Sequence, residues 1–461
     1  MSDISSSSDK SKKQRTSSVS REDDEVLQRD PGYFQYYGQL QHQQNMLQDY
    51  VRTSTYHSAI TLNGPALFQG RLVMDVGSGS GILTFFSVQA GAKHVYAVEA
   101  SGMATKMRAM LDAAKRGARN AFLADRITVI GKKIEEPQVV QDVPQVDVIV
   151  SEPIGVLLVH ERMLESYIYA RDKFLRPGGA MLPSSGAIHL APLSDAALWN
   201  ETIAKARFWQ QPAFYGVDLN PYFAPAFDEY FTAPVVGCFS PNSLMADSVQ
   251  HHVDFHTVQL ADLKAFSIPI EWRVRYTGLM HGVAGWFDLG FVPPASSLRE
   301  GGGAPNASYM STSPSSPATH WQQVRLLLKQ PLAVNSGQVV RGWVEMKVND
   351  QRSYNIEAKL ICLDESETGD LACLMEKQPS RVRSANWYLH EQTYNYAYTG
   401  EAETMKPEAA SLYLPVDSLL AESSENYPQL SSTSIQSVQG TSTNPTDFLV
   451  TTNNNEDAMQ I

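Results

Sequence analysis

The sequence predicts an α/β fold in two parts: a doubly wound, Rossmann-like parallel sheet, followed by an antiparallel β-barrel that carries a helical arm. Three observations support this prediction. Apolar runs alternate with helical segments up to about residue 185, and the glycine-rich turn GSGSG at 77–81 directly follows the first run. Beyond residue 186, apolar and polar residues alternate, as in 270–276, which is typical of half-buried antiparallel strands.

The composition allows a large core and excludes several classes of protein. The 461 residues are 43% apolar and 19% charged, and the net charge is −12. An acidic chain is poorly suited to binding nucleic-acid phosphates directly, whereas it would attract basic substrates. The three cysteines lack the spacing of a metal site or a disulfide framework. No apolar run reaches the length of a membrane span, and the N-terminus has no secretory signal. We expect a reducing compartment, no metal and no membrane contact.

The predicted domains follow from these patterns. Residues 1–30 and the Ser-, Thr- and Asn-rich residues 403–461 should be disordered. Residues 31–185 should form the parallel-sheet domain with N-terminal lid helices, and residues 186–402 the barrel.

The segment 33–60 should be helical at the start of the first domain. Leu40, Leu47, Tyr50 and Val51 could form one apolar face. The aromatic cluster within 33–37 either packs on the domain that follows or forms a lid over a ligand.

The run 71–76, the glycine turn and the helix 82–89 form the first unit of the doubly wound fold. Glycines let the backbone approach a ligand closely, and a helix N-terminus offers unpaired N–H groups. The next strand, 94–98, ends in Glu99, which could accept hydrogen bonds from both hydroxyls of a ribose.

The spacing of the turn indicates the kind of cofactor. G-x-G-x-G preceded by Asp75 differs from the dinucleotide fingerprint, and no Lys-Ser/Thr pair follows it as in a phosphate-binding loop. It suits a cofactor with a ribose and a charged amino acid but no pyrophosphate, which describes S-adenosyl-L-methionine. A turn without a ligand is the alternative.

Two carboxylates follow the fourth strand, 146–150. Glu152 and Glu161 are nine positions apart (161 − 152), so only a hairpin-like loop would bring them together. Such a pair can share a proton or bind a cation between two acceptors. The alternative is two ordinary surface glutamates. Glu135, after the third strand, could meet an adenine amino group. Strand ends of a parallel sheet share an edge, so Glu99, Glu135 and this pair should line one crevice.

Two segments interrupt the barrel. Leu198 to Tyr230 is helical and rich in aromatic residues, so its apolar surface must be covered either by its own barrel or by a second subunit. Pro293 to Pro317 is rich in Gly, Ser and Pro and is predicted to be a surface loop between two barrel strands.

The motifs VMDVGSGSGIL, VEA, SEP…ERMLES and Thr319-His320-Trp321 together resemble those of the protein arginine methyltransferases. YFQYYGQLQHQQNMLQDYVRT, HLAP, FWQQPAFYGVDL and DEYF resemble the coactivator-associated branch. The resemblance runs from about Tyr33 to Gly400, and we expect no extra domain in the thirty or so residues before it.

The resemblance implies an enzyme that transfers methyl groups from S-adenosyl-L-methionine to arginine, giving mono- and asymmetric dimethylarginine (type I). It implies protein substrates such as the histone H3 tail and RNA-associated and transcription proteins, and a role in chromatin and transcription. It also implies location in nucleus and cytoplasm, and a homodimer formed through the arm.

Roles for individual residues follow from the same resemblance. Arg52 would pair with the cofactor carboxylate, Glu152 and Glu161 would hold the substrate guanidinium, and His320 would line the pocket, paired with Asp49. The residues implied at the cofactor are Gln43, Arg52, Asp75, Gly77, Gly79, Glu99, Glu135, Ser166 and Tyr36. Those implied at the substrate are Tyr37, Met46 and Trp321.

Four positions depart from the family pattern. Ser78 stands where relatives often have Cys, which should be harmless. Ile154 and Val156 stand where Met and Tyr are expected, and His160 stands where Asn or a similar residue is expected. These changes leave the substrate range and the product open. A monomethyl or symmetric product, or a catalytically weak cofactor-binding scaffold, are the alternatives. The glycine spacing disfavours a nicotinamide-dependent oxidoreductase.

Overall fold

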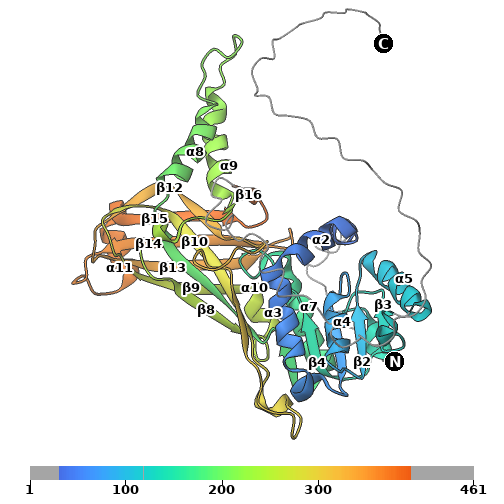
Figure 1. Cartoon of the computed structure of the whole chain (residues 1–461). Helices are drawn as coiled ribbons and strands as arrows, with labels where there is room; N and C mark the ends of the chain where they lie inside the picture. Colours follow the sequence, from blue (N-terminus) through green and yellow to red (C-terminus); the bar gives the residue numbers. More distant parts are fainter. Residues whose placement is uncertain (1–30, 118, 396–461) are drawn as a thin grey trace, which may run out of the picture. The chain divides into compact units, whose positions relative to one another are not determined.

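The computed structural model describes residues 31–117 and 119–395. The predicted disordered ends, 1–30 and 403–461, lie outside the described residues. The described part contains a five-stranded parallel sheet followed by two mainly antiparallel sheets, which confirms the predicted fold class (Figure 1).

The parallel sheet has the order β3-β2-β1-β4-β5, so the order reverses between β1 and β4. Ligands bind at such a reversal, beyond the carboxyl ends of the strands. The strands are β1 (Leu72–Val76), β2 (His94–Val98), β3 (Ile127–Ile130), β4 (Val146–Ser151) and β5 (Leu175–Leu182). The helical segments between them are α4 (Ile82–Gln89), α5 (Met103–Arg116), η2 (Ala121–Leu123), α6 (Pro137–Asp142), η3 (His160–Arg162) and α7 (Met163–Phe174).

Several helical segments precede the sheet. Residues 31–37 are helical, and α2 (Leu40–Gln48), α3 (Tyr50–Thr61) and the short π-helical turn η1 (Gly64–Phe68) follow. Asp49 has an extended backbone between α2 and α3, and its side chain accepts a hydrogen bond from the Arg52 N–H at 2.9 Å. The predicted single apolar face is therefore wrong, because the break at Asp49 changes the direction of the chain. Leu40 is 60% exposed and Tyr50 is 77% exposed.

The barrel consists of two sheets. One has the order β16-β7-β12-β10-β6-β8 with β11 beside β10, and the other has the order β15-β14-β13-β9. β8 lies beside β9 and β12 beside β15, which closes the two sheets around a common interior. The longer strands are β6 (Ser185–Leu193), β8 (Val249–Asp254), β9 (Ala265–Arg273), β10 (Gly278–Phe291), β12 (Val324–Val334), β13 (Val339–Val348), β14 (Tyr354–Leu363) and β15 (Val382–Tyr388). The short strands and helices are β7 (Val235–Val236), β11 (Ser308–Ser311), β16 (Thr393–Tyr394), η5 (Pro241–Ser243), α10 (Leu260–Lys264), η6 (Ala295–Ser297), α11 (Leu371–Lys377) and η7 (Pro379–Arg381).

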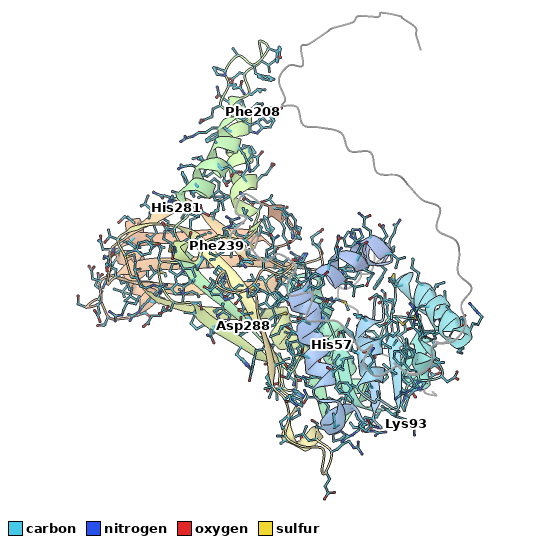
Figure 2. The ribbon with its side chains drawn as sticks, viewed as in Figure 1. His57, Lys93, Phe208, Phe239, His281 and Asp288 are labelled. Atoms are coloured by element: carbon cyan, nitrogen blue, oxygen red, sulfur yellow. The ribbon has the colours of Figure 1, made fainter. Side chains whose placement is uncertain are left out.

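The predicted arm is a pair of packed helices, α8 (Ala196–Arg207) and α9 (Phe223–Thr232), joined through η4 (Asn220–Tyr222). Its base packs on the barrel through Leu198 and Phe231, which are buried. Its outer end extends away from the barrel, and Phe208 there is 51% exposed (Figures 1 and 2). Tyr215 is 93% exposed. The barrel of the same chain therefore covers only the base of the arm.

The inserted loop is more than a surface loop. β11 pairs with β10, and the loop before it reaches the end of α3. The Asn63 side chain accepts from the Asn306 N–H at 2.9 Å and donates to the Asn306 carbonyl at 2.9 Å, and it is fully buried. This contact spans 243 positions, so local composition could not reveal it.

One hydrophobic cluster spans the sheet and the barrel. Leu157 and Leu158, from the loop after β4, are buried at 2% and 0% exposure. A Cβ at Gly285 on β10 would lie 2.7 Å from Leu157 Cδ1, and one at Gly186 on β6 would lie 2.8 Å from Leu158 Cδ1. Glycines in two barrel strands therefore make room for this loop. Among the described residues, no helix is long and apolar enough to cross a bilayer.

Candidate active site

A cavity of about 820 Å³ lies at the carboxyl edge of the parallel sheet. The N-terminal helices, the glycine turn, the loop after β4 and the barrel all contribute to its walls. The sequence-predicted residues that line it are Tyr36, Tyr37, Gln43, Met46, Arg52, Gly77, Gly79, Glu99, Glu135, Glu152, Glu161, Ser166, His320 and Trp321. Asp49 and Asp75 are not among its lining residues.

The glycine turn forms one end of the cavity. Gly77 and Gly79 have φ angles of 70° and 51°, which favour glycine. Glu99 accepts hydrogen bonds from the N–H groups of Gly79 and Ser101, both at 2.7 Å. These bonds fix the carboxylate beside the turn, where the sequence predicted a ribose partner.

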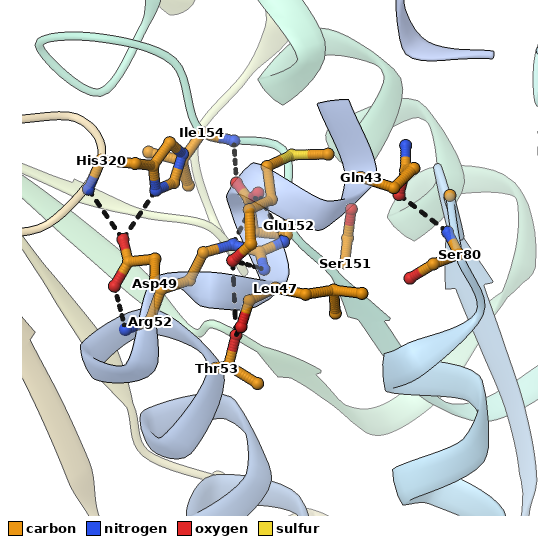
Figure 3. Close-up of polar contacts among 12 residues, drawn as sticks. Gln43, Leu47, Asp49, Arg52, Thr53, Ser80, Ser151, Glu152, Ile154 and His320 are labelled. Atoms are coloured by element: carbon orange, nitrogen blue, oxygen red, sulfur yellow. Dashed lines mark hydrogen bonds and ion pairs between the residues drawn. The ribbon is translucent and has the colours of Figure 1, made fainter. Parts of the chain in front are cut away.

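Gln43 connects the lid to the glycine turn. Its Oε1 accepts from the Ser80 N–H at 2.9 Å (Figure 3). Its Nε2 donates to the Tyr37 carbonyl at 3.1 Å. Further along the cavity, the Ser166 hydroxyl lies 2.6 Å from Glu135 Oε1. Gln43, Glu135 and Ser166, all predicted for the cofactor, thus line the cavity.

Asp75 lies beneath the turn and is fully buried. The Thr84 hydroxyl donates to its Oδ2 at 2.6 Å, and Oδ1 has no hydrogen-bond partner among the described residues. Burial raises its pKa from 3.8 to about 7, although the hydrogen bonds from Thr84 act against this. Asp75, which the resemblance implies at the cofactor, is thus buried beneath the turn and does not line the cavity. Its role toward the cofactor stays a prediction.

The loop between Glu152 and Glu161 is a tight hairpin. Gly155 forms a β-bridge with Leu158, and a Cβ at Gly155 would collide with the His160 carbonyl. Four non-glycine residues in the loop have left-handed backbones: Leu157, Leu158, Glu161 and Arg162. Each such conformation costs roughly 1–2 kcal/mol. Strain of this kind persists at functional sites when the surroundings over-determine it, as the buried leucines do here.

Glu152 binds a guanidinium of its own chain. Arg52 donates to Glu152 Oε2 from Nε at 3.1 Å and from Nη2 at 2.9 Å, and the Ile154 N–H donates to Oε1 at 3.1 Å (Figure 3). The Arg52 and Glu152 side chains are 8% and 10% exposed. The resemblance implied that Arg52 pairs with the cofactor carboxylate. In the structure, Arg52 pairs with Glu152, which is also largely buried.

Glu161 is held by tyrosines. The Tyr37 hydroxyl lies 2.7 Å from Oε1, and the Tyr33 hydroxyl lies 3.0 Å from Oε2. Burial raises the pKa of Glu161, and the charge of Glu152 raises it further, while the two hydroxyls and Arg352 lower it. The structure thus agrees with the prediction that a hairpin-like loop brings Glu152 and Glu161 together, because both carboxylates line one cavity.

Sequence reasoning missed Tyr33 and Arg352 as lining residues. Tyr33 belonged to the predicted aromatic cluster, but the cluster did not show which ring would reach Glu161. Tyr36 instead stacks on His42, with 3.6 Å between ring centroids, and is 50% exposed. Arg352 follows β13, far away in sequence, and no local signal marked it.

The Thr-His-Trp run joins the barrel to the site. Asp49 Oδ2 accepts from the His320 N–H at 2.8 Å and lies 2.7 Å from His320 Nδ1 (Figure 3). Burial alone would raise the pKa of Asp49, but hydrogen bonds from His320 and from the Arg52 backbone hold it below its usual value. The Trp321 indole N–H donates to the Ile154 carbonyl at 2.9 Å. Asp49 therefore orients His320, and Trp321 fixes the carboxylate loop.

Two family models match the chain. The arginine methyltransferase oligomerization subdomain matches residues 184–361. The ribosomal protein L11 methyltransferase (PrmA) model matches residues 54–188. The matches meet where β5 ends and the barrel begins.

Curated relatives are similar over most of the described residues. A probable histone-arginine methyltransferase 1.3 of Arabidopsis thaliana is 46% identical over 328 residues, which are 71% of this chain and 58% of the relative. The histone-arginine methyltransferase CARMER of Drosophila yakuba is 45% identical over the same shares of the two chains. The chain thus spans less than two thirds of the length of these relatives.

Solved structures resemble both domains. Protein arginine methyltransferase 10 of Arabidopsis thaliana has a TM-score of 0.62 and 28% identity, over 77% of this chain and 99% of that one. The Trypanosoma brucei PRMT1 enzyme-prozyme complex with AdoHcy has a TM-score of 0.60 and 25% identity, over the same shares. In sequence and in fold, the chain is thus similar to the protein arginine methyltransferases.

Proposed function

We propose that the protein is an S-adenosyl-L-methionine-dependent protein-arginine N-methyltransferase. The observation that carries this proposal is the buried contact of the Arg52 guanidinium with Glu152, beside a second carboxylate, Glu161. The cavity binds a guanidinium of its own chain, which is the group that a substrate arginine would present. The relatives named as histone-arginine methyltransferases support the same activity.

The residues of the cavity suit S-adenosyl-L-methionine. Glu99 offers a carboxylate to the ribose hydroxyls at a turn whose backbone is open to a ligand. A Cβ at Gly79 would lie 2.7 Å from Gln43 Oε1. As long as Gln43 is hydrogen-bonded to the turn, only glycine fits at position 79. Arg52 would hold the cofactor carboxylate, and Glu135 with Ser166 would meet the adenine end. Similar solved structures, the Trypanosoma brucei PRMT1 complex with AdoHcy and PRMT6 with SAH, support this assignment.

The two glutamates would act on the substrate. Arginine is protonated in water at any physiological pH, and its delocalised lone pairs make it a poor nucleophile. Glu152 and Glu161 would bind the guanidinium and draw its positive charge toward two of its nitrogens. The remaining nitrogen would then keep more of its lone pair for attack. S-adenosyl-L-methionine supplies an electrophilic methyl group when it is bound.

A proton must leave the attacking nitrogen as the new N–C bond forms. We assign its acceptance to His320, because Asp49 orients that ring through Nδ1. The other ring nitrogen can then take the proton at the cavity wall. The lid tyrosines would keep water from the reacting atoms.

The finer details rest on the resemblance. The proposed products are mono- and asymmetric dimethylarginine, with Met46 at the substrate end of the cavity. The proposed substrates are the histone H3 tail and RNA-associated and transcription proteins, which would place the enzyme in nucleus and cytoplasm. A homodimer would form through α8 and α9, which lie within the matched oligomerization subdomain.

Product analysis tests the proposal. Purified protein is incubated with labelled S-adenosyl-L-methionine and peptides of histone H3 or with arginines near prolines, and the methylarginines are separated by mass spectrometry. We expect asymmetric dimethylarginine. Symmetric dimethylarginine would contradict the proposed type I activity. Tight cofactor binding with no transfer to any arginine would support the alternative of a cofactor-binding scaffold.

A further inference from the structure

We propose that Arg352 is a positioning residue that holds Tyr33 and Glu161 together, so that the Glu161 carboxylate faces the substrate arginine in its charged form. This inference rests on the proposed function and adds to it a residue of the barrel. Arg352 lies in the turn between β13 and β14 and is 191 positions from Glu161.

The turn has a defined shape. Asn349 Oδ1 accepts from the N–H groups of Gln351 and Ser353, at 3.0 and 3.1 Å. Arg352 itself has a left-handed backbone, with φ at 53°. Side-chain bonds that close a turn in this way fix the direction in which its residues project. Arg352 is thus directed by the turn and lines the cavity.

Arg352 contacts both Tyr33 and Glu161 at the substrate end. Its guanidinium carbon lies 4.4 Å from the centre of the Tyr33 ring, which is within the range of a cation–π interaction. Its Nη2 donates to the Glu161 carbonyl at 3.3 Å. Tyr33 in turn donates to Glu161 Oε2 at 3.0 Å. Three segments far apart in sequence therefore form a closed ring of contacts around Glu161.

Neighbouring residues of the turn support the same loop. The Asn349 carbonyl accepts from Arg162 Nη1 at 3.2 Å, and Ser353 Oγ lies 2.8 Å from His160 Nδ1. The barrel turn thus contacts residues 160 to 162, two of which have strained backbones. Contacts of this kind are needed to keep such a conformation populated.

The charge of Arg352 also matters. Burial and the charge of Glu152, on the same loop, favour the neutral form of Glu161 and raise its pKa. Tyr33 and Tyr37, from the N-terminal helix, and Arg352, from the barrel, oppose this. Arg352 donates to the backbone carbonyl of Glu161, whereas the carboxylate oxygens accept from the neutral hydroxyls of Tyr33 and Tyr37. By contrast, Arg52 occupies the carboxylate of Glu152 itself.

The test compares Arg352→Met and Arg352→Lys with Arg341→Met. Arg341 lies on β13, pairs with Glu271 and is not among the lining residues of the cavity, so it is a matched control. The measurements are cofactor affinity, kcat and KM for an arginine peptide from about pH 6 to about pH 9, and hydrogen exchange of residues 31–37 and 152–166.

We expect Arg352→Met to leave cofactor affinity within about twofold and to lower kcat/KM about tenfold or more at neutral pH. The acid limb of its pH profile should move to higher pH, because a neutral Glu161 cannot bind a guanidinium. In Arg352→Lys, the acid limb of the pH profile should stay where it is in the wild type, because the positive charge is kept. Its kcat/KM should lie between those of Arg352→Met and the wild type. Arg341→Met should behave as wild type.

An unchanged pH profile in Arg352→Met would overturn the proposal, and so would a rate loss that is equal at every pH. Exchange of the two segments should quicken in Arg352→Met and not in Arg341→Met, whether or not the protein transfers methyl groups. If the wild type shows no transfer, the proposed function fails, and unchanged exchange in Arg352→Met would separately refute the positioning role.

Discussion

At the residue scale, the two glutamates of the cavity are held in different ways. Glu152 carries an arginine on one oxygen and a backbone N–H on the other. Glu161 carries tyrosine hydroxyls, whose own pKa values are raised by burial, so they remain donors at neutral pH. A substrate guanidinium must therefore displace Arg52 from Glu152, whereas at Glu161 it competes with neutral hydroxyls.

The spacing of the two glutamates was enough to predict a hairpin-like loop, since nine positions cannot share one helical face. The leucines that stabilise this loop were not predictable. Leu157 and Leu158 fit only because glycines stand at two barrel positions, Gly186 and Gly285, and this match is visible only in three dimensions. In the same way, the sequence placed Asp75 just before the glycine turn but did not show that its side chain is buried.

Asp75 gives a prediction for stability against pH. Its folded pKa of about 7 exceeds its usual value of 3.8, so between these values the folded protein holds a proton that the unfolded chain has lost. Stability should fall as pH rises from about 4 to about 7, by up to roughly 4 kcal/mol from this group. Urea unfolding at several pH values checks this: in Asp75→Asn, the free energy of unfolding should lack this decrease between about pH 4 and about pH 7.

A second variant makes the Asp75 prediction stricter. Thr84→Val removes a hydrogen bond that lowers the Asp75 pKa, so the decline in stability should extend to higher pH. If Asp75→Asn had the same pH dependence as the wild type, the assignment of the proton to Asp75 would be wrong.

At the element scale, α3 is the element on which the site depends most. It begins with the Asp49 cap, it carries Arg52, and the chain just after its end is bound by the loop before β11 through Asn63. Sequence patterns predicted helix in this region but not the break at Asp49, because Asp49 is capping one helix while pairing with His320 in the barrel. Long-range partners thus decided the helix boundary.

The contact between Asn63 and Asn306 can be tested by stability. Asn63→Ala removes three hydrogen bonds of a buried side chain and leaves both backbone groups of Asn306 without these partners. We expect a loss of about 2–4 kcal/mol in the free energy of unfolding. Asn306→Ala keeps these backbone bonds and loses the side-chain bond to the Leu62 carbonyl, so it should cost about 1 kcal/mol or less. Equal losses in denaturant unfolding would contradict the role of Asn63.

At the scale of the whole molecule, the arm exposes aromatic side chains that the described residues do not cover. Phe208, Tyr215 and Tyr222 are 51%, 93% and 58% exposed. The sequence predicted that the apolar surface of this helical segment must pack against another surface. In the structure, the aromatic side chains at its outer end are exposed. An exposed aromatic patch of this kind is typical of an interface.

The proposed homodimer can be tested at the arm. Phe208→Ser combined with Tyr215→Ser should convert a dimer to a monomer in sedimentation velocity, since the buried base of the arm keeps its fold. Tyr309→Ser is the control, because Tyr309 is 72% exposed but lies on β11, away from the arm. A double variant that sediments as the wild type would exclude the arm from the interface.

The central claim is that Glu152 and Glu161 bind and polarise a substrate arginine, and Glu161→Gln tests it most directly. The amide oxygen can still accept from Tyr33 and Tyr37, so the lid should remain in place. Cofactor affinity and methyl transfer to an arginine peptide are measured on the same preparation. We predict cofactor affinity within about threefold of the wild type and kcat/KM lowered about a hundredfold or more, because one charged partner of the guanidinium is lost. Near-normal transfer with intact cofactor binding would contradict the account.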